Sequence, residues 1–198
     1  MGTYNLLKMQ KKLKKYVDED RYVHTLGVMY TAAALAMRYG EDLEKAQVAG
    51  LLHDCAKCIP NEKKLKLCRQ NEIPISEVEE KSPFLLHAVL GAYLAREKYE
   101  IKDQDILNAI ACHTTGKPDM SLLEKIIFIA DYIEPMRSKA ENLPLIRRLA
   151  FEDLDQAVYI TLRDTLLYLE KEKSCLDNQT IIAYNYYRQL IEEREKEA

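Results

Sequence analysis

Long apolar runs, tryptophan, glycine and proline are all scarce in this 198-residue chain. No segment approaches the roughly 18 uncharged apolar residues that a membrane-spanning helix requires, so we expect no membrane partner. The six glycines, six prolines and lack of long polar tracts argue against disorder. The lysine-rich start has no apolar segment followed by a small-residue cleavage site, which argues against a signal peptide. We therefore expect a soluble, cytoplasmic protein.

An excess of charge of one sign is also missing. The chain has 29 basic and 32 acidic residues, with a formal net charge of -3. No global field favours nucleic acid as a partner, and the lysines in residues 8–15 and 63–66 are expected to form solvated surfaces. The length suits one domain that can bury a sizeable core.

Paired cysteines are not evident either. The five cysteines are an odd number, which suits reduced thiols in a cytosol. Cys55 and Cys58 form a C-x-x-C, but no second pair that would complete a zinc site follows, and no strand that would support a redox motif precedes it. Helical packing is therefore the preferred interpretation of this pair.

Apolar residues recur at helical spacing, and no alternating β pattern of useful length is present. We predict an all-α protein in which residues 1–198 form a single domain. Its core spans about residues 20–135, and C-terminal helices in about residues 143–195 pack on that core. The predicted helices are residues 4–17, 21–39, 43–57, 62–70, a segment from 82, 106–113, 122–133, 143–150, 153–173 and 179–195.

The four histidines of the chain, His24, His53, His87 and His113, all fall on apolar faces or at the ends of predicted helices. Asp54 follows His53 directly, and Asp131 lies within a very apolar helix, where a buried carboxylate needs a cation or a donor. Neighbours in this series are separated by about one helix and its connection. Five helices could therefore each deliver an inward ligand, which is how helical bundles build metal sites.

Imidazoles and carboxylates together suit iron, manganese or zinc better than magnesium or calcium. A bound divalent ion can polarise a phosphoryl group and bring a coordinated water towards a neutral pKa, which predicts hydrolysis of a phosphoanhydride. His87 and His113 could bind a second ion, or could act as imidazolium groups that neutralise phosphate or protonate the leaving group.

Two cations lie close to this series in the sequence. Lys57, one turn after His53, could bind a phosphate, although a lysine at a helix C-terminus also compensates the helix dipole. Arg137 is the preferred phosphate ligand because a guanidinium binds two oxygens at once, the alternative being a solvated side chain.

His24, His53-Asp54 and Asp131 together resemble the H…HD…D signature of the HD-domain metal-dependent phosphohydrolases. Within that family, five phrases are similar to the YqeK branch of bacterial symmetrical bis(5′-nucleosyl)-tetraphosphatases. The phrases are RYVHTLGV from Arg21, HDCAK from His53, HAVLGA from His87, HTTG from His113 and ADYIEP from Ala130. The resemblance covers about residues 5–190.

The resemblance implies an HD-domain helical bundle that hydrolyses diadenosine tetraphosphate to two ADP. It implies an iron ion held by His24, His53, Asp54 and Asp131, with His87 and His113 facing the phosphates or a second metal. Our candidate catalytic residues are Asp54, His87 and His113, together with Lys57, which is chosen for its position after His53. A homodimer is also in keeping with the resemblance. The nucleotide contacts that it implies are His24, His87, His113, Thr114, Asp131, Arg137, Glu172, Lys173, Ser174, Cys175, Leu176 and Asp177.

The sequence departs from the family near its C-terminus. Cys175-Leu176-Asp177 and Tyr184-Asn185 stand where an Ile-His-Pro-like phrase and an Arg-Asn pair are usual, which leaves the nucleotide preference open. The alternatives are an HD-type nucleotide phosphohydrolase of other specificity, an oxygen-activating di-iron enzyme and a non-catalytic nucleotide-binding helical module.

Overall fold

Helices make up all the regular structure in residues 4–140, 142–172 and 177–197, which are those that the computed structural model describes. The prediction of an all-α fold is confirmed. In chain order the elements are α1 (Leu6–Leu13), α2 (Glu19–Tyr39), α3 (Leu43–Leu52), α4 (Asn61–Gln70), α5 (Glu77–Lys81), the 3-10 helix η1 (Pro83–Leu86), α6 (His87–Tyr99), α7 (Gln104–Cys112), α8 (Leu122–Ile133), α9 (Leu143–Glu152), α10 (Leu154–Lys171) and α11 (Asn178–Glu197).

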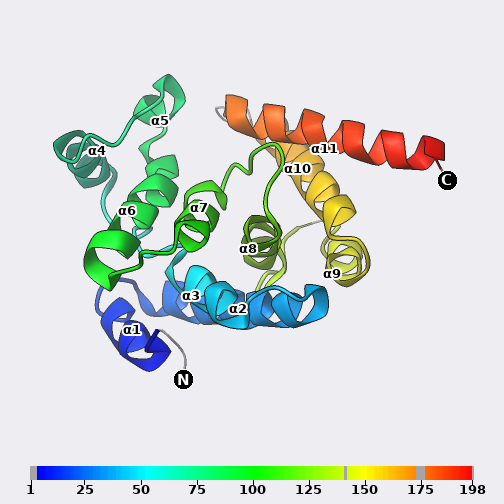
Figure 1. Ribbon diagram of the computed structural model, residues 1–198. Coiled ribbons are helices and arrows are strands. Elements are labelled where there is room, and N and C mark those ends of the chain that lie inside the picture. Colours follow the sequence, from blue (N-terminus) through cyan, green and yellow to red (C-terminus); the bar gives the residue numbers. More distant parts are fainter. Residues whose placement is uncertain (1–3, 141, 173–176, 198) are drawn as a thin grey trace.

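Helix α8 lies at the centre of the molecule, with α2, α3, α7, α9 and α10 packed around it (Figure 1). A capping box between Ser121 and Glu124 begins it, and Pro135 follows its end. Most of its side chains are buried, and each large one that leaves water contributes about 1.5–3 kcal/mol. This hydrophobic environment surrounds the helix that carries Asp131.

Helices α2 and α3 form a closely packed antiparallel pair. Gly40 ends α2 in the left-handed conformation with φ 75°, and the Asp42 side chain caps the start of α3. The two backbones approach so closely that a Cβ on Gly50 would lie 2.9 Å from Cα of Met29. This pairing brings the first half of α2, with His24, beside the C-terminal end of α3, with His53.

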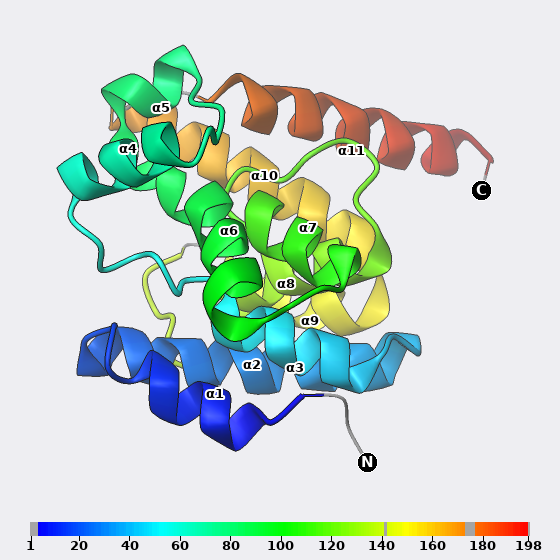
Figure 2. The same ribbon diagram turned by 60° about the vertical axis from the view of Figure 1, so that its left-hand side comes forward.

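Helices α10 and α11 pack on each other, and α10 also packs on α8 and α9. In Figures 1 and 2, α11 extends along one side of the molecule towards the C-terminus. Tyr187 of α11 is buried, and its hydroxyl oxygen accepts a hydrogen bond from the backbone N–H of Met120. Among the described residues, no helix is long and apolar enough to cross a membrane.

Three predictions differ clearly from the structure. Helix α1 spans Leu6–Leu13 rather than residues 4–17, because the chain after Leu13 continues in turns. Helix α3 ends at Leu52 rather than near residue 57, because the backbone continues in tight turns whose N–H groups bond three residues back, from Cys55 to Leu52 and from Lys57 to Asp54. The short helix α5 was not predicted. It begins at a capping box between Ser76 and Glu79, in a segment that we expected to form a turn.

Candidate metal centre

The four histidines come from four different elements and meet in the interior. His24 lies on α2, His53 caps α3, His87 begins α6 and His113 caps α7. Three pairs of rings contact each other edge to face. The ring centroids are 5.4 Å apart for His24 and His53, 5.0 Å apart for His53 and His113, and 5.0 Å apart for His87 and His113. None of the four is more than 8% exposed.

Each imidazole is oriented by an acceptor at Nδ1. The backbone carbonyls of Gly50, Phe84 and Ile110 lie 2.7, 2.6 and 2.7 Å from Nδ1 of His53, His87 and His113, three residues back in each case. The Nδ1 atom of His24 lies 3.1 Å from Oε1 of Glu134. Because each Nδ1 faces an acceptor, the ring proton is assigned to Nδ1. The lone pair of each Nε2 is then available to a ligand in the interior.

Two carboxylates complete the cluster. Oxygens of Asp54 lie 3.5, 3.2 and 3.6 Å from Nε2 of His53, His87 and His113. Oδ1 of Asp131 lies 3.1 Å from Nε2 of His24 and 3.9 Å from that of His53. The predicted metal site built from several facing helices is therefore present as a geometric cluster.

Both aspartates are held in the ionised form. Burial by itself raises the pKa of Asp54, but the nearby imidazoles of His53, His113 and His87 outweigh it and place that pKa well below its usual range. Burial opposes ionisation of Asp131 as well, and His24 and His53 lower its pKa in the same way. Carboxylates in this state are the form that binds a cation.

The donor atoms fit a transition-metal ion. Nε2 of His24, Nε2 of His53 and Oδ1 of Asp54 are buried without a hydrogen-bond partner among the described residues. Two overlapping groups, His24-His53-Asp131 and His53-Asp54-His113, each bring three ligand atoms within 4.8 Å of one another. Unpartnered buried nitrogen and oxygen atoms that converge in this way are a set that iron, manganese or zinc would satisfy.

His87 differs from the other histidines of the cluster in its surroundings. Burial lowers its pKa to about 4, although Asp54 opposes that shift. The ring is therefore neutral near pH 7, which favours a role as a metal ligand or hydrogen-bonding group over the imidazolium alternative. Nζ of Lys57 and Oγ1 of Thr114 each lie 3.1 Å from its Nε2.

Cationic side chains border the cluster. Arg137 reaches Asp131 with Nη2 at 2.7 Å from Oδ1, and it stays 44% exposed. Lys57 lies 3.8 Å from Asp54. Arg21, to which we gave no role from the sequence, lies 2.7 Å from Oδ2 of Asp54. Its position three residues before His24, on the same face of α2, is the signal that could have identified it.

Glu134 was also missed. It is 1% exposed, contacts His24 through Oε1 and accepts the backbone N–H of Met136 through Oε2. A Cβ on Gly27 would lie 2.6 Å from its Oε2, so the glycine leaves room for the carboxylate. Arg147 holds the following turn by donating to the carbonyls of Ile133, Glu134 and Arg137.

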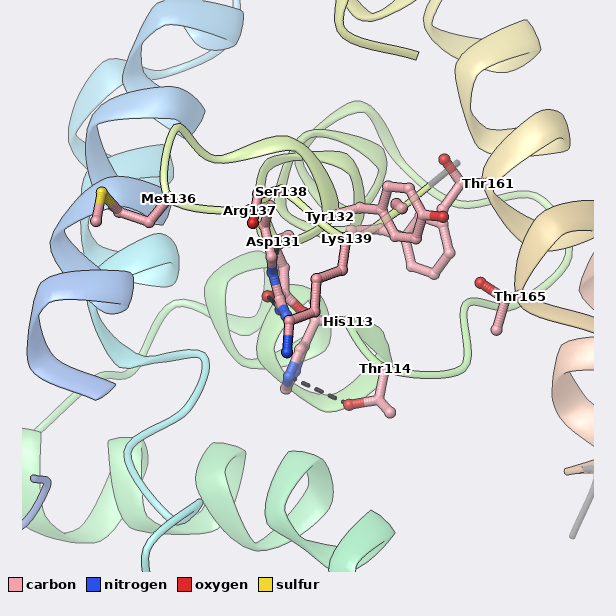
Figure 3. Close-up of a pocket in the computed structure, with 12 residues that line it drawn as sticks. His113, Thr114, Asp131, Tyr132, Met136, Arg137, Ser138, Lys139, Thr161 and Thr165 are labelled. Atoms are coloured by element: carbon pink, nitrogen blue, oxygen red, sulfur yellow. Dashed lines mark hydrogen bonds and ion pairs between the residues drawn. The ribbon is translucent and has the colours of Figure 1, made fainter. Parts of the chain in front are cut away.

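A cavity of about 440 Å³ opens beside the cluster, between α7, α8 and α10 (Figure 3). Its walls include His113, Thr114, Asp131, Tyr132 and Arg137, all labelled in the figure. We call this the α10 cavity.

The other residues implied for nucleotide binding lie towards the C-terminus. Glu172 is exposed at the C-cap of α10, whereas Asp177 lines a neighbouring cavity that also borders Thr114. The predicted contacts Lys173, Ser174, Cys175 and Leu176 lie outside the described residues.

Residues 21–136 match the HD domain model, so the chain belongs to the HD-domain family. This range contains every residue of the histidine and aspartate cluster. Within the family, the chain is 40% identical to "Bis(5'-nucleosyl)-tetraphosphatase, symmetrical" of Bacillus subtilis, over 88% of this chain and 92% of that relative. It is 42% identical to the protein of the same name in Halalkalibacterium halodurans, over 87% of this chain and 91% of the relative.

A solved structure shares the fold and much of the sequence. The crystal structure of a predicted HD superfamily hydrolase involved in NAD metabolism from Clostridium acetobutylicum is 42% identical, with a TM-score of 0.90. The alignment covers 95% of this chain and 99% of that one.

Proposed function

We propose that this protein hydrolyses diadenosine tetraphosphate symmetrically, with water, to two molecules of ADP. The observation that carries the proposal is the convergence of His24, His53, Asp54 and Asp131 in a chain similar over most of its length to symmetrical tetraphosphatases. Water adds to one inner phosphorus, and the oxygen that bridges the two inner phosphorus atoms leaves with the other ADP.

We propose iron as the ion held by these four residues, with manganese and zinc as the alternatives. His87 and His113 are the ligands of a second ion if two are bound. When bound, such an ion polarises phosphoryl oxygens and lowers the pKa of a coordinated water. The ionised carboxylates of Asp54 and Asp131 and the unpartnered Nε2 atoms of His24 and His53 support this choice.

The cations around the cluster bind and orient the tetraphosphate. Arg137 offers its guanidinium from the rim of the α10 cavity, and Arg21 offers a second one from α2. Lys57 lies 3.1 Å from His87, where its ammonium stabilises charge on the departing phosphate. His87, His113 and Thr114, which contact one another, supply further hydrogen-bonding groups.

Product analysis tests this function. Metal-loaded protein is incubated with diadenosine tetraphosphate, and the nucleotides are separated by anion exchange. ADP as the sole product supports the proposal, whereas ATP with AMP shows asymmetric cleavage and contradicts it. A parallel panel of nucleoside mono- and triphosphates and cyclic nucleotides identifies another specificity, and a turnover that requires oxygen identifies oxidative chemistry.

We further propose that the enzyme works in the cytoplasm as a homodimer. Cys55, Cys58, Cys68 and Cys112 are free thiols, which supports a reducing compartment. Light scattering of the purified protein measures the mass in solution, and a monomer would contradict the dimer.

A further inference from the structure

A second cavity lies next to the metal centre and shares the lining residue Thr114 with the first. It has a volume of about 560 Å³, lies between α6, α7 and the start of α11, and is lined by Val89, Ala111 and Thr114 among others. Thr114 also lines the α10 cavity, and its Oγ1 lies 3.1 Å from Nε2 of His87 and 3.2 Å from Nε2 of His113. Thr114, which contacts two histidines of the cluster, is therefore a wall that the two cavities share. We call the second one the α7 cavity.

Symmetrical cleavage requires room for the substrate on two sides of the reacting phosphorus atoms. The broken bridge is at the middle of the tetraphosphate, so a nucleoside diphosphate half must extend from the reacting phosphorus atoms to each side. The α10 cavity, at about 440 Å³, and the α7 cavity, at about 560 Å³, each fall within the range of about 300–1,000 Å³ of small-ligand sites. One cavity for each half would meet that requirement.

The charges of the two cavities differ. The α10 cavity carries Lys139 and Arg137, and Arg137 is paired with Asp131 at 2.7 Å, which leaves one lining cation in excess. In the α7 cavity Lys117, the one lysine among the described lining residues, is paired with Glu124 at 2.8 Å, and the carboxylates of Glu79 and Asp177 are further negative charges. Anionic walls repel phosphate, so the α7 cavity suits the uncharged end of a nucleotide.

Its other walls suit a nucleoside. Val89 and Ile182 offer apolar surface for the faces of a base. Asn108 accepts a hydrogen bond from Gln104 through Oδ1, which leaves its amide N–H groups as donors, and Gln179 adds a second amide. Carboxylates beside them can accept hydrogen bonds from ribose hydroxyls.

We propose that the α7 cavity binds the second nucleoside of the substrate, while the α10 cavity binds the first. This proposal rests on the proposed function and adds which cavity binds each half of the substrate. Phe128 and Tyr132 provide aromatic walls for the base in the α10 cavity.

Filling the α7 cavity tests the proposal. Ala111 is partly exposed on α7, so Ala111→Trp can place its ring in the cavity without displacing the core. Its matched control is Ala111→Ser. Each metal-loaded protein is assayed with diadenosine tetraphosphate and with adenosine 5′-tetraphosphate, which lacks the second nucleoside. We expect Ala111→Trp to lose roughly tenfold or more in kcat/KM for the first substrate and less than about twofold for the second.

A smaller change at the exposed Asn108 provides a second variant that leaves the core intact. Asn108→Ala is expected to raise KM for diadenosine tetraphosphate by roughly three- to tenfold, with adenosine tetraphosphate unaffected. Equal kinetics of wild type and both variants, or a loss that is proportional for the two substrates, would overturn the assignment. Failure of the wild type itself to cleave diadenosine tetraphosphate would contradict the proposed function instead, and this inference with it.

Discussion

The orientation of four imidazoles explains why so many histidines share one small volume. Each Nδ1 has its own acceptor, three of them backbone carbonyls one turn back and the fourth the carboxylate of Glu134. Because these acceptors fix the ring orientation before any ligand arrives, each Nε2 is presented inwards at little cost in side-chain entropy.

At the level of single residues, we predict a clear division between ligands and phosphate contacts. His53→Ala and Asp54→Ala should each abolish both metal occupancy and turnover, because each removes a buried donor of the cluster. Arg137→Ala should retain the ion and weaken nucleotide affinity by roughly tenfold or more, since it removes a guanidinium fork. Elemental analysis with steady-state kinetics checks this, and wild-type turnover in Asp54→Ala would refute the ligand assignment.

Glu134 gives a second prediction, on a residue that positions a ligand. The Glu134→Gln side chain has the same shape but no charge. Only one of its two terminal atoms can still accept a hydrogen bond, so it cannot serve both His24 and Met136 as the carboxylate does. We expect metal affinity to fall roughly 10–100-fold, measured by competition with a chelator. Glu152→Gln, at an exposed carboxylate, is the control, and unchanged affinity in Glu134→Gln would show that the contact does not orient the imidazole.

The sequence indicated which histidines and aspartates lie together, and gave less information about the groups that support them. Histidine is rare in this chain. The sequence places each histidine either on an apolar helix face or at a helix end. Glu134 lies beyond the predicted end of its helix, and its partner His24 is distant in sequence. The contact depends on how α2 packs on α8, which periodicity does not encode.

At the scale of helices, the approach of α2 to α3 sets the distance between His24 and His53. Gly50→Ala would place a methyl group 2.9 Å from Cα of Met29, and backbone cannot move aside as a flexible side chain does. We expect a loss of about 1–3 kcal/mol in the free energy of unfolding, measured by urea denaturation.

The comparison for this variant is Gly40→Ala. A Cβ at Gly40 meets nothing within 4 Å, so only the left-handed φ of 75° is penalised, by roughly 1 kcal/mol. A smaller loss for Gly50→Ala than for Gly40→Ala would show that the two helices separate easily.

Helix positions were predicted well wherever a capping residue and an apolar face coincide, as for α8 and the start of α3. The predicted end of α3 lies about five residues beyond the observed end at Leu52. The sequence after Leu52 gives no clear stop signal before Pro60, so the helical pattern extends through His53 and Asp54. The tight turns that follow place both residues towards the cluster, so tertiary contacts override local preference there.

For the whole molecule, the buried His87 predicts a loss of stability in mild acid. Its pKa falls from 6.5 to about 4 on folding, so the unfolded chain takes up a proton first as the pH is lowered. The free energy of unfolding of the chelator-treated protein should therefore fall between pH 6.5 and 4, by up to about 3 kcal/mol from this group. The carboxylates Asp54 and Asp131, whose pKa values are depressed, stabilise the fold above their ordinary pKa near 3.8, and that contribution is lost only below it.

Urea denaturation at several pH values, with His87→Asn alongside, measures this effect. The variant should show a smaller change than wild type across that interval. Identical pH dependence of the two proteins would show that His87 is not held neutral in the fold.

The most direct test of the central claim is a metal titration of the wild-type protein stripped with a chelator. Fe²⁺ is added without oxygen, and the bound ion per chain is measured together with ADP release from diadenosine tetraphosphate. We predict that ADP formation starts near zero and rises in proportion to bound ion until the site is filled. Full activity in the stripped protein, or ion binding that leaves ADP formation unchanged, would contradict the account.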